Sequence, residues 1–493
     1  MEGAVPNGSL IESSGTATRA ALARVMPVRI LNGHVHVSLV FLGLLEGAVA
    51  FASLYIAIVV RFESLSASIS EFHETVGLIW PRAALIAGVT LLSLASMGLY
   101  QLRQRARFPG IVVRLLLAVV LAHVGLALIF YVEPAFLLGR GLMGLAGLFM
   151  FAGFIAIRYA FLKLVDENIF KRRILVWGAG ARAATIAARM RRRSDQRGFK
   201  MIGYVLAPGD RAEVPGHQLI DRDTSLLQLA TQHGIEEIVV APDDCRRGLP
   251  IDELLQCRIR GIEVSDILAF FERESGRVNV ALMHPSWLIF SKGFRCDVVR
   301  LTSKRMFDIV VSICILLLNS PIALLTAIAI FLEDQGPVLY RQLRVGQNGR
   351  TFRMLKFRSM RIDAEANGKA VWAMRNDRRV TRVGALIRKL RIDELPQVLN
   401  VLIGHMSFVG PRPERPEFVE ELTRAIPYYP ERHAVKPGIT GWAQVQYRYG
   451  ASEKDARAKL EYDLYYVKHH SLAFDLMVLL QTVEVVLFGI GSR

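Results

Sequence analysis

Cysteine is scarce in this sequence. The 493 residues include four cysteines, Cys245, Cys257, Cys296 and Cys314. They show neither the paired spacing of a zinc site nor the pattern of a disulfide framework. A disulfide-stapled secreted domain and a cysteine-based metal centre are therefore excluded, and the thiols are expected to be reduced residues of the interior.

Charged residues are also few, and acidic residues are the scarcer kind. Only 21% of the residues are charged, with 44 Asp and Glu against 61 Lys and Arg, which gives a formal net charge of +17. Because 52% of the residues are hydrophobic, the composition predicts a membrane protein. The positive charge calls for acidic partners, and phosphates or anionic membrane lipid fit a membrane chain better than nucleic acid, which is not expected.

Four long apolar stretches lie in the N-terminal third, at about 36–60, 83–100, 113–131 and 141–157. Each is close to the roughly 20 residues that cross a bilayer, so residues 1–165 are predicted to form a tail and a four-helix transmembrane bundle. The first stretch lies too far from the start, and runs too long, to be a cleaved signal peptide. Lys and Arg gather before the first stretch, between the second and third, and after the fourth, which predicts that these segments are cytoplasmic.

A glycine-rich turn follows the anchor. In "RRILVWGAGARAATIAARM" an apolar run precedes Gly178 and Gly180, and a helical pattern follows. This order predicts a Rossmann-like α/β domain over 166–299, with the two glycines as a possible nucleotide-binding turn. The second strand, however, ends near Leu206, where an NAD site requires an acid. A structural or regulatory module is favoured over a cofactor-using one, and both remain open.

Basic residues, glycine and proline concentrate after residue 300. Four basic residues stand in a setting suited to holding phosphates: Lys356, Arg358, Arg412 and Arg415. Asp393 and Glu394, in "RIDELP", form the adjacent acid pair of this basic tract. Magnesium usually takes one or two carboxylates and completes its shell with phosphate oxygens, so the tract predicts phosphoryl transfer involving a lipid phosphate. The simpler alternative is a surface helix whose acids pair with Arg388 and Arg391.

One more apolar run lies within residues 304–332. Its length would allow a crossing, but Lys304 and Arg305 precede it and several arginines follow it, so both ends qualify as cytoplasmic. Ser320 and Pro321 lie near its middle, and proline removes a helical hydrogen bond. The sequence therefore predicts a re-entrant membrane helix that breaks at these two residues and returns to the face it entered.

Five stretches in the C-terminal part resemble the bacterial sugar transferase family, the monotopic polyprenyl-phosphate phosphoglycosyl transferases. They are "KRMFDI", "GPVLYRQLRVGQNGRTFRMLKFRSM", "RIDELPQVLNVLIGHMSFVGPRPERPEF", "VKPGITGWAQV" and "KLEYDLYYVKHHSLAFDL". The resemblance covers about 300–493 and implies an α/β-containing catalytic domain there. The anchor and central domain resemble the long form of the family, the hexose-1-phosphate transferases, and in particular the branch of exosortase-associated exopolysaccharide systems.

The resemblance implies transfer of a sugar 1-phosphate from a UDP-sugar to undecaprenyl phosphate, with release of UMP. Asp393 would be the nucleophile that forms a covalent phosphosugar intermediate, and Glu394 would help hold Mg²⁺, or Mn²⁺, or handle protons. Lys356, Arg358 and Arg412 would match the positions that grip phosphate. The product would begin exopolysaccharide, capsule or O-antigen synthesis, and a homodimer with its catalytic domain on the cytoplasmic face of the bacterial inner membrane is expected.

Two alternatives remain open at this point. A membrane nucleotide-sugar oxidoreductase or dehydratase, run by the central domain, would carry bound NAD. A non-enzymatic scaffold of polysaccharide assembly, with a vestigial acid pair, would release no UMP. The sequence also leaves open which sugar is transferred.

Overall fold

The computed structural model describes residues 28–30, 33–35, 37–62, 77–100, 108–164, 171–190, 196, 198–244, 249–291, 293–294, 297–361, 379–447, 450 and 452–488. The chain divides into two compact units, Met1–Asp266 and Ile267–Arg493. The first unit opens with a short antiparallel pair, β1 (Val28–Ile30) and β2 (Gly33–Val35).

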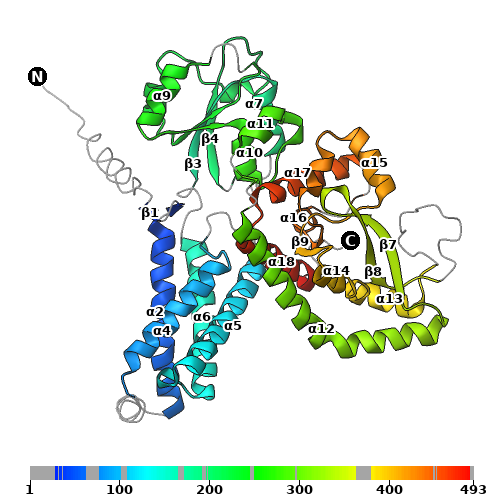
Figure 1. The fold of residues 1–493 in the computed structure, drawn as a ribbon. Helices are drawn as coiled ribbons and strands as arrows, with labels where there is room; N and C mark the ends of the chain where they lie inside the picture. The colour runs from blue at the N-terminus through cyan, green and yellow to red at the C-terminus, as the bar shows by residue number, and fades with distance from the viewer. Residues whose placement is uncertain are drawn as a thin grey trace, which may run out of the picture. The chain divides into compact units, whose positions relative to one another are not determined.

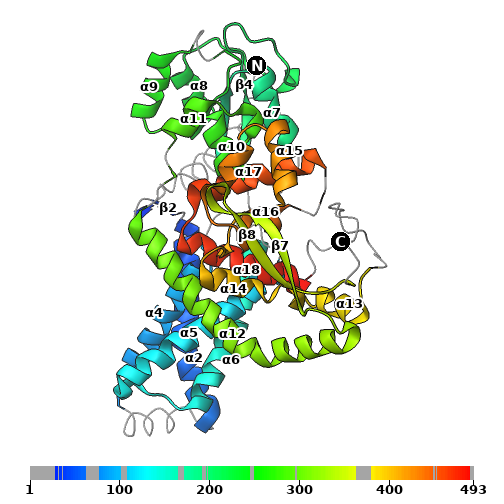
Figure 2. The ribbon, with the colours of Figure 1, turned by 45° about the vertical axis from the view of Figure 1, so that its right-hand side comes forward.

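Four apolar helices follow in the first unit: α2 (Val37–Phe62), α4 (Ile79–Ser96), α5 (Phe108–Val132) and α6 (Arg140–Leu164). Each overlaps one of the predicted apolar stretches, and each is long and apolar enough to cross a membrane. They lie side by side (Figures 1 and 2) and share one buried core that includes Leu54, Ile86, Leu115 and Phe154. Many of their outward-facing residues are also apolar, as a lipid environment requires.

A buried polar cluster links three of these helices. Arg158 of α6 donates from Nε to Glu46 Oε1 of α2 (2.6 Å), and the hydroxyl of Tyr100, just after α4, donates to Glu46 Oε2 (2.5 Å). Arg158 also donates to the carbonyl of Leu99 (2.8 Å). Buried charges in apolar surroundings are tolerated only when paired, so the cluster fixes α2, α4 and α6 in one register.

A four-stranded parallel sheet completes the first unit. Its strands are β3 (Arg172–Trp177), β4 (Phe199–Val205), β5 (Glu237–Val240) and β6 (Glu263–Asp266), in the order β4-β3-β5-β6. Its helices are α7 (Ala181–Arg189), α8 (Leu226–Gln232) and α9 (Ile251–Ile259). The strand order reverses between β3 and β5, and the carboxyl ends of such strands are where open α/β sheets bind ligands. The mixed α/β region expected from the sequence is present.

The second unit is mostly helical. Its helices are α10 (Ile267–Ser275), α11 (Pro285–Phe290), α12 (Val298–Asp334), α13 (Arg382–Lys389), α14 (Gln397–Ile403), α15 (Pro416–Ala425), α16 (Trp442–Gln446), α17 (Glu453–His469) and α18 (Leu472–Phe488). The strands β7 (Leu339–Val345) and β8 (Thr351–Phe357) form an antiparallel hairpin, while β9 (Ser407–Val409) and β10 (Gly438–Thr440) pair in parallel. Val401, Met406, Tyr466 and Val478 lie in its main core.

The segment ahead of α12 is built into this second unit. Val278, Val280 and Met283 are buried in a cluster with residues of α17 and of the turn after α15. The indole N–H of Trp442 donates to the carbonyl of Gly276 (2.7 Å). The compact unit therefore begins at Ile267, whereas the sequence places a boundary between residues 299 and 300.

Helix α12 runs for 37 residues with Pro321 inside it. The sequence predicts a break at Ser320 and Pro321, but the helix continues through both residues, and its ribbon changes direction partway along it (Figures 1 and 2). Proline offers no N–H to the carbonyl four residues earlier, and the hydroxyl of Ser320 donates to that carbonyl, on Leu317 (2.8 Å). Because this side-chain hydrogen bond satisfies the carbonyl of Leu317, the helix can continue past Pro321 without a break.

Both ends of α12 are attached to the second unit. Near its start, Arg305 donates to the carbonyls of Val401 (2.7 Å) and Leu402 (2.6 Å), and Lys304 pairs with Asp475 (2.5 Å). At its end, the Glu333 carboxylate accepts from the first backbone N–H groups of α13. Between these ends most of the helix surface is apolar and exposed.

Candidate functional site

The acid pair lies on a single 3-10 turn, Ile392–Glu394. Helix α13 ends just before it, Arg391 takes a left-handed conformation (φ 59°), and Pro396 precedes the first residue of α14. A 3-10 turn has about three residues per turn, so neighbouring side chains point roughly 120° apart. Asp393 and Glu394 therefore face different partners.

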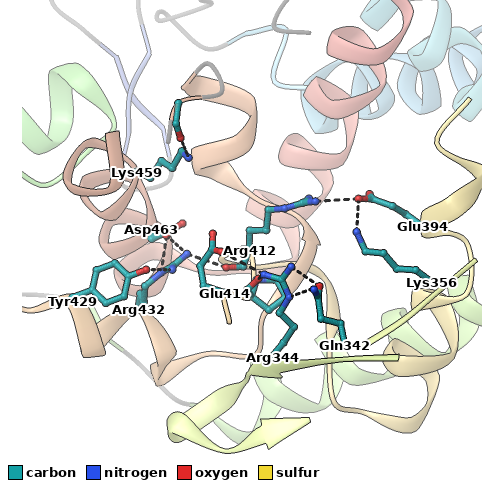
Figure 3. A network of polar contacts seen from close by, with 12 residues as sticks. Gln342, Arg344, Lys356, Glu394, Arg412, Glu414, Tyr429, Arg432, Lys459 and Asp463 are labelled. Carbon is teal, nitrogen blue, oxygen red and sulfur yellow. Dashed lines mark hydrogen bonds and ion pairs between the residues drawn. The ribbon is translucent and has the colours of Figure 1, made fainter. Parts of the chain in front are cut away.

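Glu394 lies at the centre of a basic cluster (Figure 3). Its Oε1 accepts from Arg412 Nη2 (3.0 Å) and Lys356 Nζ (3.3 Å), and Arg391 Nη1 lies 4.0 Å away. Burial opposes ionisation of this carboxyl, but the three cations outweigh it and lower the pKa of Glu394 to about 2. Glu394 is therefore a fixed anion that holds Lys356 and Arg412 in place.

Asp393 has the opposite character. It is 8% exposed, and its Oδ1 has no hydrogen-bond partner among the described residues. Burial and the neighbouring charge of Glu394 raise the pKa of Asp393, against the effect of Lys356. A buried carboxylate oxygen without a partner in this setting suits a nucleophile or a metal ligand.

The donor set bears on the kind of metal. In the described part of the chain no group of three or more His, Cys, Asp and Glu side chains could hold a metal ion by itself. A site with two carboxylates beside phosphate-binding cations fits Mg²⁺, which keeps few protein ligands and takes the rest of its shell from phosphate and water. The residues present thus fit Mg²⁺ held by Asp393 and Glu394 together with a diphosphate.

The turn that carries Arg412 is held from two sides (Figure 3). On one side, Arg432 Nη2 donates to the carbonyl of Arg412 (3.0 Å), and Arg432 is itself paired with Asp463 (2.7 Å) inside the core. On the other side, Arg344 Nη1 donates to the carbonyl of Pro413 (3.0 Å). These contacts fix the backbone from which Arg412 reaches Glu394.

The structure brings together four of the predicted residues, namely Asp393, Glu394, Lys356 and Arg412. Arg358 makes no ion pair with the acid pair among the described residues, and its buried guanidinium instead pairs with Asp334 at the end of α12 (3.4 Å). Arg415 precedes α15 and adds positive charge near Arg344. The remaining predicted positions lie outside this cluster: Ser320 and Pro321 in α12, and Gly178 and Gly180 in the first unit.

Sequence reasoning missed the residues behind this cluster. Arg344 and Gln397 line a small cavity beside Arg412, and Arg432 and Asp463 fix the backbone of Arg412. Asp463 lies within the motif "KLEYDLYYVKHH", whereas Arg432 lies three residues ahead of "VKPGITGW" and outside the recognised motifs. The motif position of Asp463 was the one sequence signal for this pair; its pairing with Arg432 appears only in the structure.

Comparisons with known proteins agree with the motifs. Residues 299–489 match the family described as "Bacterial sugar transferase". The UDP-N-acetylgalactosamine-undecaprenyl-phosphate N-acetylgalactosaminephosphotransferase of Aeromonas hydrophila is 45% identical over 240 residues, which are 49% of this chain and 56% of that protein. The undecaprenyl-phosphate glucose phosphotransferase of Komagataeibacter xylinus is 33% identical over 326 residues, 64% of this chain and 59% of that protein.

The match thus spans just over half the length of these two relatives. A third relative, the exopolysaccharide production protein PSS of Rhizobium leguminosarum bv. phaseoli, is 42% identical over 191 residues, which are 37% of this chain and 94% of that protein. Nearly the whole of that relative is therefore contained in this chain. On this match, together with the ordered motifs that surround the acid pair, the chain belongs to the bacterial sugar transferase family.

Proposed function

We propose that this protein transfers a sugar 1-phosphate from a UDP-sugar to undecaprenyl phosphate, releasing UMP and starting the synthesis of an exopolysaccharide, capsule or O-antigen. One observation carries the proposal: a buried carboxylate oxygen of Asp393, which has no hydrogen-bond partner among the described residues, lies beside a Glu394 that already holds two cations. The names of the relatives, which describe undecaprenyl-phosphate sugar phosphotransferases, support the same reaction.

The reaction proceeds in two displacements. An oxygen of Asp393 attacks the phosphorus that bears the sugar, and the bond from that phosphorus to the UMP oxygen breaks, so UMP leaves with the bonding electrons. A phosphate oxygen of undecaprenyl phosphate then attacks the same phosphorus and releases the Asp393 carboxylate. A covalent intermediate replaces one difficult displacement with two easier ones, which is the usual advantage of covalent catalysis.

Glu394 prepares the site for its charged substrate. Before substrate binds, it holds Lys356 and Arg412 at 3.3 and 3.0 Å. An incoming diphosphate carries more negative charge than one carboxylate, so it takes over both cations without any large rearrangement of their side chains. When bound to Asp393 and Glu394, Mg²⁺ would supply further charge neutralisation for the diphosphate.

The membrane arrangement is part of the proposal. The four apolar helices of the first unit would form a transmembrane bundle whose basic flanks face the cytoplasm, and the parallel sheet would be a Rossmann-like domain. Helix α12 would enter the membrane and return. Its start binds α14 and its end binds α13, both within the second unit, so a simple crossing would require the bilayer to cut through one folded unit.

The decisive experiment measures exchange of labelled UMP into UDP-sugar without any lipid acceptor, over a panel of UDP-sugars. The wild-type protein should catalyse exchange with its own donor, and Asp393→Asn should abolish it, because an amide is not a competent nucleophile. Glu421→Gln, on the exposed surface of α15, serves as the matched control and should behave as the wild type.

Two outcomes would contradict the proposal in different ways. Exchange that strictly requires undecaprenyl phosphate would replace the covalent step with direct attack by the lipid. No UMP release with any donor, in the presence of acceptor and Mg²⁺, would favour the scaffold alternative.

A further inference from the structure

The glycine turn of the first unit has the place in the fold where dinucleotide-binding domains hold a pyrophosphate. It follows β3 and leads into α7, at the point where the strand order reverses. In such domains the glycines leave room for phosphate, and the backbone N–H groups at the start of the helix bind it. The first question is what occupies that room here.

The room beside both glycines is filled by the chain itself. Gly178 has a positive φ (122°), and a Cβ built on it would lie 2.4 Å from the carbonyl oxygen of Ala241. A Cβ on Gly180 would lie 2.0 Å from Oδ2 of Asp243. The glycines are therefore explained by the close approach of the segment after β5.

Asp243 occupies the start of α7. Its Oδ2 accepts from the N–H of Ala181 (3.0 Å) and its Oδ1 accepts from the N–H of Arg182 (2.8 Å). These are the first two N–H groups of the helix, and a carboxylate there is also favoured by the helix dipole. The groups that would bind a phosphate thus already bind an anion.

A second carboxylate fixes the first. Asp210 Oδ1 accepts from the N–H of Asp243 (3.0 Å), and its Oδ2 accepts from the N–H of Ala179 in the glycine turn (3.1 Å). Two carboxylates therefore lie against the glycine turn and the start of α7, the part of such domains that binds a pyrophosphate. The negative charges of a pyrophosphate would repel both carboxylates, so a pyrophosphate would have to displace Asp210 and Asp243 to bind here.

The ribose end of the expected site is missing as well. Strand β4 ends at Val205, and the next residue is Leu206, an apolar side chain that is 48% exposed. An NAD site places an acid near this point to bind the ribose hydroxyls. The N–H groups that would bind the phosphates are thus occupied by carboxylates, and the residue directly after β4 is not an acid.

We infer that the glycine turn is capped by its own chain: Asp243 takes the position of a dinucleotide phosphate, and the domain uses no dinucleotide cofactor. The domain then serves the transferase as a structural module, and oxidoreductase chemistry has no place in this protein. This inference is independent of the reaction proposed for the second unit.

The test uses the full-length protein in detergent and two probes, NADH and inorganic pyrophosphate. Energy transfer from Trp177, directly before the turn, to NADH should reveal no saturable binding by the wild type. Asp243→Ala frees two N–H donors and removes one negative charge, so it should bind pyrophosphate at least about tenfold more tightly than the wild type. Asp244→Ala removes the same charge one residue away and is the matched control, with wild-type behaviour expected.

Saturable NADH binding by the wild type that Gly180→Val abolishes would overturn the inference. Equal affinity of the wild type and Asp243→Ala for pyrophosphate would also overturn it, because the carboxylate would then not be the occupant of the site. A single cooperative unfolding transition and unchanged UMP release show that each variant is folded, although loss of the cap lowers the unfolding midpoint of Asp243→Ala.

Discussion

Glu272 holds the segment ahead of α12 on the last part of the second unit, and its removal should be costly. Lys468 Nζ donates to Glu272 Oε2 (2.7 Å), and His469 Nε2 lies 2.5 Å from Glu272 Oε1. The Lys468 and Glu272 side chains are only 5% and 8% exposed. In Glu272→Ala the ammonium of Lys468 would remain buried without its anion, with the ring of Trp287 as its neighbour.

Removing one partner of a buried ion pair costs about 3–5 kcal/mol. In a unit of this size each kcal/mol lowers the unfolding midpoint by about 2–4 °C, so Glu272→Ala should lower it by about 6–20 °C. Glu420→Ala breaks an exposed pair with Arg424 on α15, and is expected to cost at most about 0.5 kcal/mol. It is the matched control.

The assay is thermal unfolding of the detergent-solubilised full-length protein, followed by tryptophan emission and by residual UMP release. Adding Lys468→Met to Glu272→Ala should recover much of the lost stability, because the uncompensated charge is gone. If Glu272→Ala lowers the midpoint no more than Glu420→Ala does, the segment ahead of α12 is not bound as described and the reasoning fails.

Three further outcomes are expected. Burial and the charge of Arg432 lower the pKa of His433 to about 4, below its unfolded value near 6.5; the unfolded chain therefore takes up the proton first, and stability should fall by about 3 kcal/mol as the pH drops from 6.5 to 4. His433→Phe should reduce this pH dependence of the free energy of unfolding. If the dependence is the same in His433→Phe as in the wild type, His433 is not its cause. In a cysteine-free background, Ser303→Cys and Gln347→Cys should both resist an impermeant thiol reagent until cells are lysed, whereas external labelling of position 347 alone would establish a crossing. Chelation should stop transfer and added Mg²⁺ should restore it, which full activity after exhaustive chelation would contradict.

The sequence predicted those parts of the molecule that local pattern encodes. The apolar stretches correspond to α2, α4, α5 and α6, although α4 begins at Ile79 and α5 at Phe108, ahead of the predicted starts. Hydrophobicity marks the middle of such a helix better than its ends, since end residues contact both apolar and polar surroundings. The acid pair and its cations were identified from the basic tract after residue 300, and the resemblance of the motifs then implied their roles.

What the sequence did not predict depends on contacts between distant residues. Asp243 reaches the N–H of Ala181 across 62 positions, and only the adjacency of β3 and β5 brings them together. Arg358 lies two residues after Lys356, a spacing that would place both on one face of a strand. Strand β8 ends at Phe357, however, and Arg358 pairs with Asp334. The packing of residues 267–291 against the rest of the second unit likewise has no periodic sequence signal, since their contacts are with helices more than 100 residues later.

Because both ends of α12 are bound to the second unit, the length of the helix fixes how far its middle extends from that unit. From Asp308, which accepts from Ser407, to Pro321 the helix advances about 20 Å, and from there to Glu333 a little less, against about 15 Å for one leaflet of hydrocarbon. Deleting one residue from either arm would shorten it by about 1.5 Å and rotate its end by about 100°, so the contacts at that end would be lost. In the proposed re-entrant arrangement, the length of the arms would set how deeply α12 enters the bilayer. Deleting seven residues, about two turns, from both arms should reduce that depth while nearly preserving the facing of both ends.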